Sequence, residues 1–227
     1  KFIWDKSCQA YTKTYKTKNL ILTSFEEIWV KGYFEVTAPR IEKIMFSKFR
    51  KDPSKFPLQT PSGKIEISSE TISNFKLPDC HSHPYWYEPY EWLGNVNEYP
   101  LHLISNQPSH RLHSQLDNAE MSQKSKIHGK EPVMINSKDA AERDINNGDI
   151  VMLYNARGRV LAGAKISDNV MPGVVVLSTG AWFDPNYDLN IEMHGNPNVL
   201  TKDVGTSSLG QGPTCHTTLV ELKKSSN

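Results

Sequence analysis

The sequence lacks several features that would place it in a simple class. Its 227 residues include only three cysteines, Cys8, Cys80 and Cys215, which are far apart and odd in number. That usage indicates neither a disulfide framework nor a Cys-x-x-Cys metal site. No apolar run approaches the roughly 18 residues of a membrane-spanning helix, so no membrane span is expected.

A charge excess of either sign is also missing. The 26 basic and 25 acidic residues leave a formal net charge of +1, which argues against a polyanion-binding surface and hence against nucleic acid as a partner. The chain has no Gly-x-Gly-x-x-Gly run and no Walker loop, which excludes the common dinucleotide and P-loop phosphate sites. Because it begins at Lys1 without Met or a signal-peptide pattern, we expect it to be a piece of a longer protein.

Histidines are present, but their spacing is not that of a metal site. A zinc site needs three or four ligands that converge in space. These histidines lie in irregular or extended segments and form no His-Glu-x-x-His helix, so no metal ligand is predicted. A zinc hydrolase is kept as an alternative. The residues concerned are His81, His83, His102, His110, His113 and His128.

The first hundred residues are irregular, with short helical patterns. Ser24 and Glu27 form a possible capping box, and Gly32 ends the helix that follows. Apolar residues keep a helical spacing from Ile41 to Phe49.

A turn and a connector complete this part. A turn at 60–63 precedes a short predicted strand containing Ile65 and Ile67. From Leu77 to Pro100 the chain is rich in proline and aromatic residues, and we interpret it as an ordered connector that packs over a neighbour.

The second half predicts many short strands and one brief helix. The strands alternate or are continuously apolar and are separated by Gly, Asn, Asp and Pro turns. This pattern favours a closed barrel, so the fold class is mainly β with minor α, preceded by an irregular α+β segment. We expect a boundary near Asn97 to Pro100, with domains 1–98 and 99–227. The strands are expected at 101–104, 131–135, 150–154, 160–166, 174–177 and 217–222, and the helix at 138–143 behind Ser137.

Polar loops are the candidate functional segments. The apolar strand 101–104 ends in eleven residues, 105–115, of which nine are polar. They include Arg111, which suits phosphate, and amide and hydroxyl side chains, which suit a polar heterocycle. Two further loops, 180–185 and 195–216, are rich in glycine and hydroxyls and allow close approach of a ligand to the backbone. A plain solvated loop is the alternative for each.

The run from Ala140 to Ser167 resembles the C-terminal signature of prokaryotic molybdopterin oxidoreductases. The matching positions have fixed spacing and include Asp144-Ile145, Asn147, Asp149, Asn155 and Gly158. Segments 60–67, 108–115, 180–185, 196–201 and 205–207 are similar to the same family. Within it, the dimethyl sulfoxide, trimethylamine N-oxide and biotin sulfoxide reductases are the most similar group.

This resemblance implies a fold, a cofactor and an activity. The barrel would be a six-stranded double-psi β-barrel that covers a bis(molybdopterin guanine dinucleotide) cofactor with molybdenum. The full-length enzyme would reduce S-oxides or N-oxides by oxygen-atom transfer, and this fragment alone would be inactive because it contributes no catalytic residue. An independent double-psi barrel binding module without a redox role is the alternative, since fold does not determine function.

The resemblance also implies cofactor contacts and partners. Gln107 stands where some relatives carry His, and Cys215-His216 stands where a relative carries Gly-Gln. Partners would be the upstream domains of the same polypeptide and an electron donor such as a c-type cytochrome or another reductant. A bacterial, periplasmic enzyme of anaerobic respiration is expected, or a cytoplasmic one if it resembles biotin sulfoxide reductase. The implied contacts are Ser105, Gln107, Arg111, His113, Ser114, Asn198, Cys215 and His216.

Overall fold

The structure is a computed structural model that describes residues 1–14, 22–34, 44–96 and 98–225. The chain divides into two compact units, residues 1–66 and 67–227. None of the helices in the described ranges is long and apolar enough to cross a membrane.

The described part of the first unit contains three helices, α1 (Phe2–Thr14), α2 (Phe25–Lys31) and α3 (Ser47–Lys51). The capping box predicted before α2 is confirmed: the Ser24 hydroxyl accepts from the backbone N–H of Glu27, whose carboxylate accepts from the N–H of Ser24. Gly32 ends α2 in the left-handed conformation that glycine adopts readily. Residues 41–43 of the predicted helix lie outside the described ranges, and α3 covers part of its end.

The strand predicted around Ile65 and Ile67 is wrong. Both residues are largely exposed, and no strand of the described chain pairs with this segment. The second unit then begins with α4 (Glu70–Phe75) and a connector that contains η1 (Leu93–Asn95). The rings of the connector contact one another, and Tyr85 stacks on His81 at 3.9 Å between centroids. The connector contacts the barrel through part of its length: the Tyr99 ring meets the Tyr154 ring edge-on at 6.3 Å between centroids, and Lys202 Nζ lies 5.0 Å from the centre of the Tyr90 ring, whereas Trp86 is 69 % exposed.

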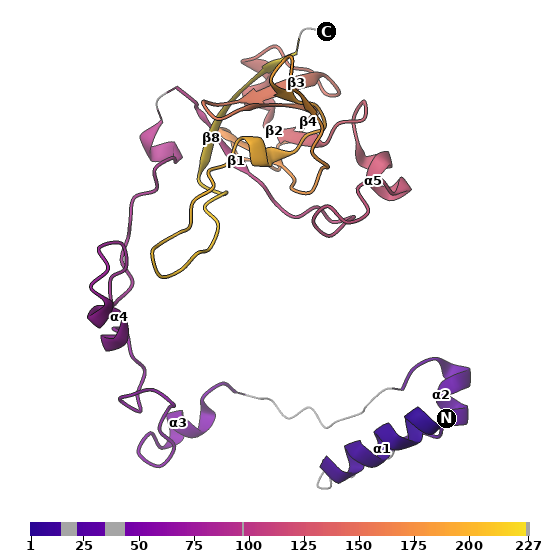
Figure 1. The fold of residues 1–227 in the computed structure, drawn as a ribbon, viewed down its shortest axis with the longest axis vertical. Helices are drawn as coiled ribbons and strands as arrows, with labels where there is room; N and C mark the ends of the chain where they lie inside the picture. The colour runs from indigo at the N-terminus through magenta and orange to yellow at the C-terminus, as the bar shows by residue number, and fades with distance from the viewer. Residues whose placement is uncertain (15–21, 35–43, 97, 226–227) are drawn as a thin grey trace. The chain divides into compact units, whose positions relative to one another are not determined.

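Six strands of the second unit close into a barrel (Figure 1). They follow the order β2-β5-β1-β8-β3-β4, and β4 pairs with β2 to complete the ring. The β1–β5 and β2–β4 pairs are parallel, while the other four pairs are antiparallel. This is the predicted double-psi β-barrel. The strands are β1 (Leu101–Ile104), β2 (Pro132–Ile135), β3 (Ile150–Tyr154), β4 (Arg159–Ile166), β5 (Val174–Leu177) and β8 (Thr218–Lys224).

The barrel encloses an apolar core. The inward-facing side chains of its strands, such as Leu103, Ile135, Leu153 and Val175, are fully buried, and Leu200 of a later loop joins them. Burying each such side chain contributes roughly 1.5–3 kcal/mol relative to leaving it exposed. The described second unit therefore has a core of its own.

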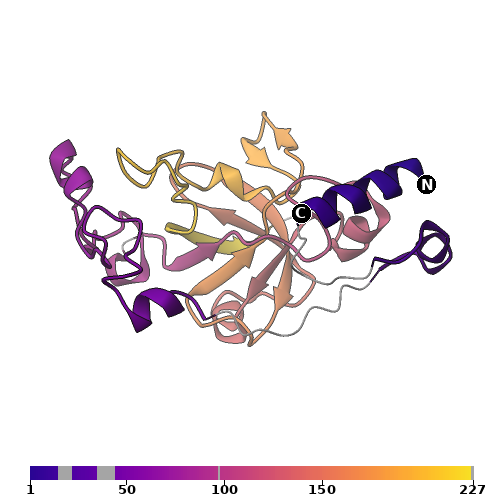
Figure 2. The ribbon, with the colours of Figure 1, turned by 90° about the horizontal axis from the view of Figure 1, so that it is seen from below.

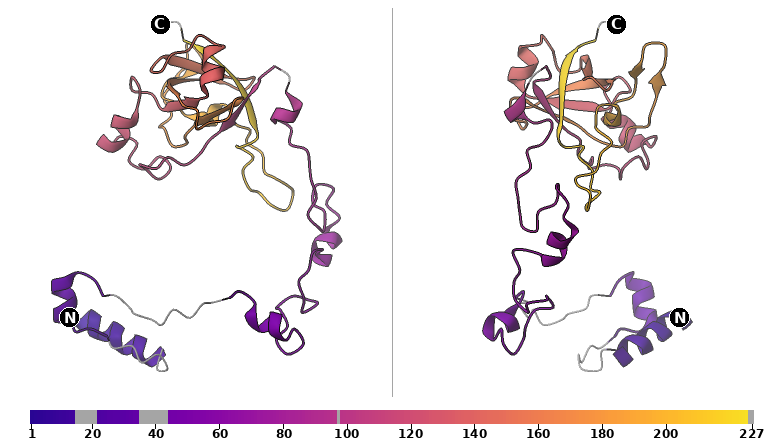
Figure 3. Two further views of the ribbon diagram at one scale, coloured as in Figure 1. Left: turned by 180° about the vertical axis from the view of Figure 1, so that it is seen from behind. Right: turned by 60° about the vertical axis from the view of Figure 1, so that its left-hand side comes forward.

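Additional elements surround the barrel. The predicted helix appears as α6 (Ser137–Ala141), but its N-cap is Asn136, whose side chain accepts from the N–H of Lys138. The sequence interpretation missed α5 (Glu120–Ser125), the β6 (Pro185–Asn186) and β7 (Ile191–Glu192) hairpin, and η2 (Pro197–Val199). The hairpin projects from the barrel beside β4 (Figures 2 and 3).

Candidate functional site

One end of the barrel gathers the loops that the sequence singled out. Strand β1 ends at Ile104, which pairs with Val176 of the parallel strand β5, so the loops after both strands leave from the same end. In the antiparallel β8, Thr218 lies opposite Leu103, so the segment that enters β8 starts at this end as well. The Asn106 carbonyl accepts from the N–H of Thr179 at 2.9 Å and joins the two loops directly.

A cavity of about 400 Å³ at this end joins three of the expected cofactor residues. His113 and Ser114 come from the loop after β1, and Asn198 comes from η2. The third wall is the loop after β5, with Trp182 and Phe183. Among the described residues, no hydrogen-bond partner engages the His113 ring, the Ser114 hydroxyl or the Asn198 amide, so these groups are available to a ligand.

A second cavity, of about 750 Å³, is lined by residues 106–110 of the loop after β1. Gln107 lines it, and the Gln107 amide donates to the Arg111 carbonyl at 2.8 Å. Apolar residues of the outer barrel surface, Met134 and Val176, form part of its wall, together with Lys165.

The remaining expected residues lie near the same end but line neither cavity. Ser105 directly follows β1 and is half-buried. Cys215 is half-buried and His216 is exposed just before β8, and the Cys215 carbonyl accepts from the Thr218 hydroxyl at 3.1 Å. The structure therefore brings His113, Ser114 and Asn198 together in one cavity and leaves Ser105, Cys215 and His216 on the segments around it.

Arg111 lies inside the protein rather than on a cavity wall. Its side chain has no exposed surface, and one guanidinium nitrogen, Nη2, contacts Glu131 at 3.0 Å and donates to the Thr179 carbonyl at 3.0 Å. The other, Nη1, lies 3.6 Å from Asp117 and donates to His110 Nε2 at 3.0 Å. An alternative to a ligand contact was an ion pair of Arg111 with Asp117 or Glu120 on the protein surface. Arg111 does contact Asp117, but in the interior, and this burial favours a role in holding the loop.

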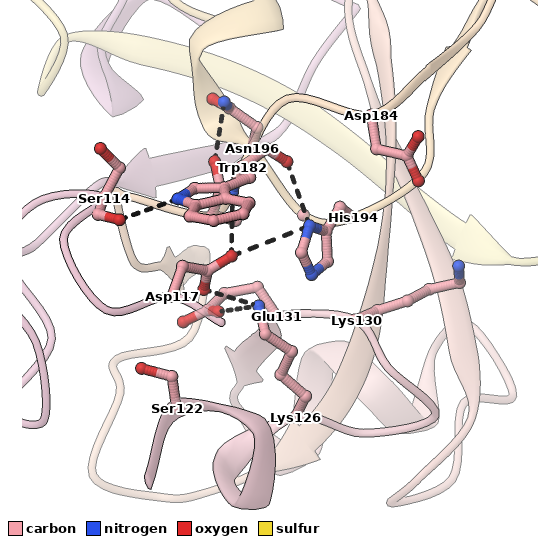
Figure 4. A network of polar contacts seen from close by, with 12 residues as sticks. Ser114, Asp117, Ser122, Lys126, Lys130, Glu131, Trp182, Asp184, His194 and Asn196 are labelled. Atoms are coloured by element: carbon pink, nitrogen blue, oxygen red, sulfur yellow. Dashed lines mark hydrogen bonds and ion pairs between the residues drawn. The ribbon is translucent and has the colours of Figure 1, made fainter. Parts of the chain in front are cut away.

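Two cations and two carboxylates form a buried cluster beneath the loop. Lys126 Nζ contacts Asp117 at 2.9 Å and Glu131 at 3.3 Å, and all four side chains, including Arg111, are at most 2 % exposed. Burial would raise the pKa of Asp117, but hydrogen bonds from Lys126 and the Trp182 backbone and the charge of Arg111 bring this pKa below its usual value. The cluster is charge-balanced, as buried charges need to be. Figure 4 shows Lys126 between the two carboxylates.

A third buried carboxylate organises the segment that leads to Asn198. Glu192 of β7 is 2 % exposed, and its oxygens accept from the backbone N–H groups of Asp184, His194, Gly195 and Asn196 at 2.7–3.1 Å. These hydrogen bonds curve the chain around the Glu192 carboxylate, and η2, which carries Asn198 of the cavity lining, follows directly. Asn196 then donates to the Ala181 carbonyl at 2.9 Å and ties this segment to the loop after β5 (Figure 4).

The sequence interpretation missed the residues that build the site from beneath. Lys126, Glu131 and Glu192 gave no local signal, because their partners lie far away in the chain or are backbone groups. Trp182 was part of a family-like segment, but nothing in that segment indicated its contacts. Among the described residues, no group of three His, Cys, Asp or Glu side chains is arranged to hold a metal ion.

Comparison with known proteins shows the family to which the chain is similar. Residues 101–219 match the family described as "Molydopterin dinucleotide binding domain". The chain is 46 % identical over 232 residues to trimethylamine-N-oxide reductase of Salmonella typhi, which covers 99 % of the chain. It is 45 % identical over 202 residues to biotin sulfoxide reductase of Cereibacter sphaeroides, which covers 89 %. Dimethyl sulfoxide/trimethylamine N-oxide reductase of Cereibacter sphaeroides is 41 % identical over 221 residues and covers 95 %.

The chain spans only 27 % of the length of each of these relatives. Among solved structures, acetylene hydratase from Pelobacter acetylenicus is similar with a TM-score of 0.63 and 16 % identity, over 89 % of this chain and 28 % of that one. At this level of identity the likeness concerns the fold alone.

Proposed function

Because the chain belongs to the family of molybdopterin dinucleotide-binding domains, we propose that it covers a bis(molybdopterin guanine dinucleotide) cofactor in a larger reductase. The relatives that match almost the whole chain are named for trimethylamine N-oxide, biotin sulfoxide and dimethyl sulfoxide. We infer that the full-length protein reduces an S-oxide or an N-oxide. When bound, the molybdenum cofactor supplies the oxygen-atom transfer chemistry, and the protein binds and orients it.

The observation that carries this proposal is the convergence of His113, Ser114 and Asn198 on one cavity. The edge of a pterin presents both hydrogen-bond donors and acceptors. A serine hydroxyl, an asparagine amide and a neutral histidine ring can each donate and accept, so the donor set fits the group. The rings of Trp182 and Phe183, 48 % and 59 % exposed, supply flat apolar surface beside these polar groups.

The other expected contacts enter the proposal in different ways. Gln107 and Ser105 lie in the loop after β1, which lines both cavities, and Cys215 and His216 lie in the segment that enters β8. Each of these could reach a large dinucleotide that lies across this end of the barrel. Arg111 supports the loop from beneath, because its cationic groups already meet Asp117 and Glu131.

Partners and compartment follow only from the resemblance. We infer that the rest of the same polypeptide contributes the remaining cofactor contacts, and that an electron donor such as a c-type cytochrome reduces the enzyme. The relatives of the trimethylamine N-oxide type favour the periplasm, whereas the biotin sulfoxide relative favours the cytoplasm.

Metal and nucleotide content of the full-length protein tests the proposal. The wild type should release stoichiometric molybdenum and guanine nucleotide on denaturation, and His113→Ala and Asn198→Ala should retain less of both after dialysis. Asn169→Ala, at an exposed position away from the cavity, is the matched control. Full-length protein that contains neither molybdenum nor a pterin would contradict the proposal and favour an independent binding module.

A further inference from the structure

Trp182 makes three hydrogen bonds to two different segments around the smaller cavity, the loop after β1 and the segment after β7. Its backbone N–H donates to Asp117 at 3.1 Å, and its indole Nε1 donates to the Ser114 carbonyl at 2.8 Å. Its own carbonyl accepts from His194 Nδ1 at 3.1 Å. Each polar group of Trp182 is thus bonded within the protein (Figure 4), while the residue lines the cavity and is 48 % exposed.

The loop that Trp182 contacts has a strained backbone. His113 and Leu116 adopt φ angles of +49° and +63°, a left-handed conformation that costs side-chain-bearing residues of order 1 kcal/mol or more each. Such a conformation persists only where its surroundings hold it. The two hydrogen bonds from Trp182 fall within this stretch, on Ser114 and on Asp117.

Asp117 connects Trp182 to the buried charge cluster. One carboxylate oxygen accepts from Trp182, and the other contacts Lys126 and Arg111. The cluster is charge-balanced and removed from solvent, so losing one member leaves an uncompensated buried charge. Asp117 therefore has little freedom to move, and the backbone of Trp182 is held to a fixed point.

We propose that Trp182 is a positioning residue that latches the loop after β5 to the loop after β1, and so sets the separation of His113 and Ser114 from the opposite wall before a ligand enters. This inference rests on the proposed function in one respect, namely that the ligand of this cavity is part of the molybdopterin dinucleotide. The latch itself depends only on contacts within the chain. Gly180 allows the two loops to approach each other closely, because a side chain at this position would collide with the His113 carbonyl.

The first test measures the latch without the cofactor. Full-length protein from cells that cannot make the cofactor is compared by amide hydrogen exchange with its Trp182→Phe variant, which keeps an aromatic ring and loses the indole donor. Exchange at residues 112–117 should be roughly 2- to 10-fold faster, as expected for one lost hydrogen bond. Exchange in β3 should not change.

A matched variant separates this effect from the general cost of replacing a tryptophan. Trp92→Phe also removes one indole hydrogen bond, to Glu88 at 3.2 Å, but in the connector. It should leave exchange at residues 112–117 unchanged. If Trp182→Phe speeds exchange throughout the barrel, or changes residues 112–117 no more than Trp92→Phe does, the latch is refuted. Trp182→Tyr, which also keeps an aromatic ring and lacks the indole donor, provides a second variant if Trp182→Phe does not fold.

The second test measures the consequence for the cofactor. Molybdenum and guanine nucleotide retained after dialysis should fall by a similar 2- to 10-fold in full-length Trp182→Phe and stay at wild type in Trp92→Phe. Wild-type retention in Trp182→Phe, with loss in His113→Ala and Asn198→Ala, would overturn the positioning role and leave the proposed function intact. Wild-type retention in all three variants would overturn both the positioning role and the assignment of this cavity to the cofactor, whereas full-length protein without molybdenum or pterin would overturn the proposed function.

Discussion

Glu91 and Arg157 lie 66 positions apart in the chain and meet in a two-armed ion pair. Arg157 Nη1 and Nη2 donate to Glu91 Oε1 and Oε2 at 2.6 and 2.9 Å. Lys202 contacts the same carboxylate at 2.9 Å, and the backbone N–H of Leu219 donates to it at 2.8 Å. One carboxylate of the connector thus contacts the β3–β4 turn, the segment after η2 and the start of β8.

The ionisation of the Glu91 carboxylate should make the stability of the protein depend on pH. Burial would raise the pKa of Glu91, but hydrogen bonds from Arg157, the Leu219 backbone and Lys202 lower it from 4.5 to about 2. A lowered pKa means that the contribution is complete above the unfolded value and is lost as the pH falls from 4.5 towards 2. The free-energy difference between wild type and Glu91→Gln, measured by urea unfolding, should be about 1–3 kcal/mol at pH 7 and clearly smaller at pH 3. A difference independent of pH would contradict this, and Glu88→Gln is the exposed control.

The contact between Glu91 and Arg157 also leads us to a prediction about the domain boundary. The expected boundary at 98/99 would remove Glu91 from the barrel, whereas the compact unit that begins at Ile67 retains it. Residues 67–227 should therefore be more stable than residues 99–227, by about 1–3 kcal/mol. Denaturant midpoints of the two chains measure the difference. If Glu91→Gln in the longer chain loses much less stability than the truncation does, other connector contacts are responsible.

Arg111→Ala should be strongly destabilising. It leaves Asp117 and Glu131 with only Lys126 as a buried cation, and breaking a buried ion pair in this way costs about 3–5 kcal/mol. Arg111→Lys should recover part of the loss, because it restores the charge without the two-armed geometry. Arg143→Ala is the matched control, since Arg143 pairs with Glu221 near the surface and a partly exposed pair contributes about 1 kcal/mol or less. Equal losses of unfolding free energy in the two alanine variants would argue against the buried cluster.

Gly180→Ala should disturb the cavity, because a Cβ there would lie 1.9 Å from the His113 carbonyl oxygen. Gly148→Ala is its control: both glycines have φ near +90°, but a Cβ at Gly148 meets nothing within 4 Å. Both variants carry the cost of a left-handed alanine, of order 1 kcal/mol. The additional loss in Gly180→Ala, measured by thermal unfolding, reports the collision. Identical losses would mean that the loops move apart freely.

Local pattern was sufficient to predict most of the barrel. Strands β1, β3 and β5 begin and end at the predicted residues, because each is a short apolar segment bounded by turn residues. Strand β4 departs from strict alternation at Gly163, which is buried against Ile127. Gly163 is covered by Ile127, which lies 36 positions earlier in the chain. The alternation of apolar and polar residues along a strand cannot predict such a distant contact.

The site was harder to predict, and Arg111 illustrates why. A polar loop with an arginine suggests a ligand contact when only neighbours in sequence are considered. Its burial results from Glu131 and Thr179, which reach it through the closure of the barrel. Asn198 and His113 were predicted to share a site through the family resemblance, and their common cavity depends on Glu192, which no motif indicated.

Closure of the barrel also determines how this chain would self-associate. Each of the six barrel strands has a paired neighbour on both sides, so these strands present little open edge to which another chain could add. The connector is different, because its rings of Trp86 and Tyr90 are 69 % and 87 % exposed outside the barrel. Within the unit 67–227, replacing these two rings by serine should therefore lower aggregation, measured by light scattering, while the thermal unfolding of the barrel stays unchanged.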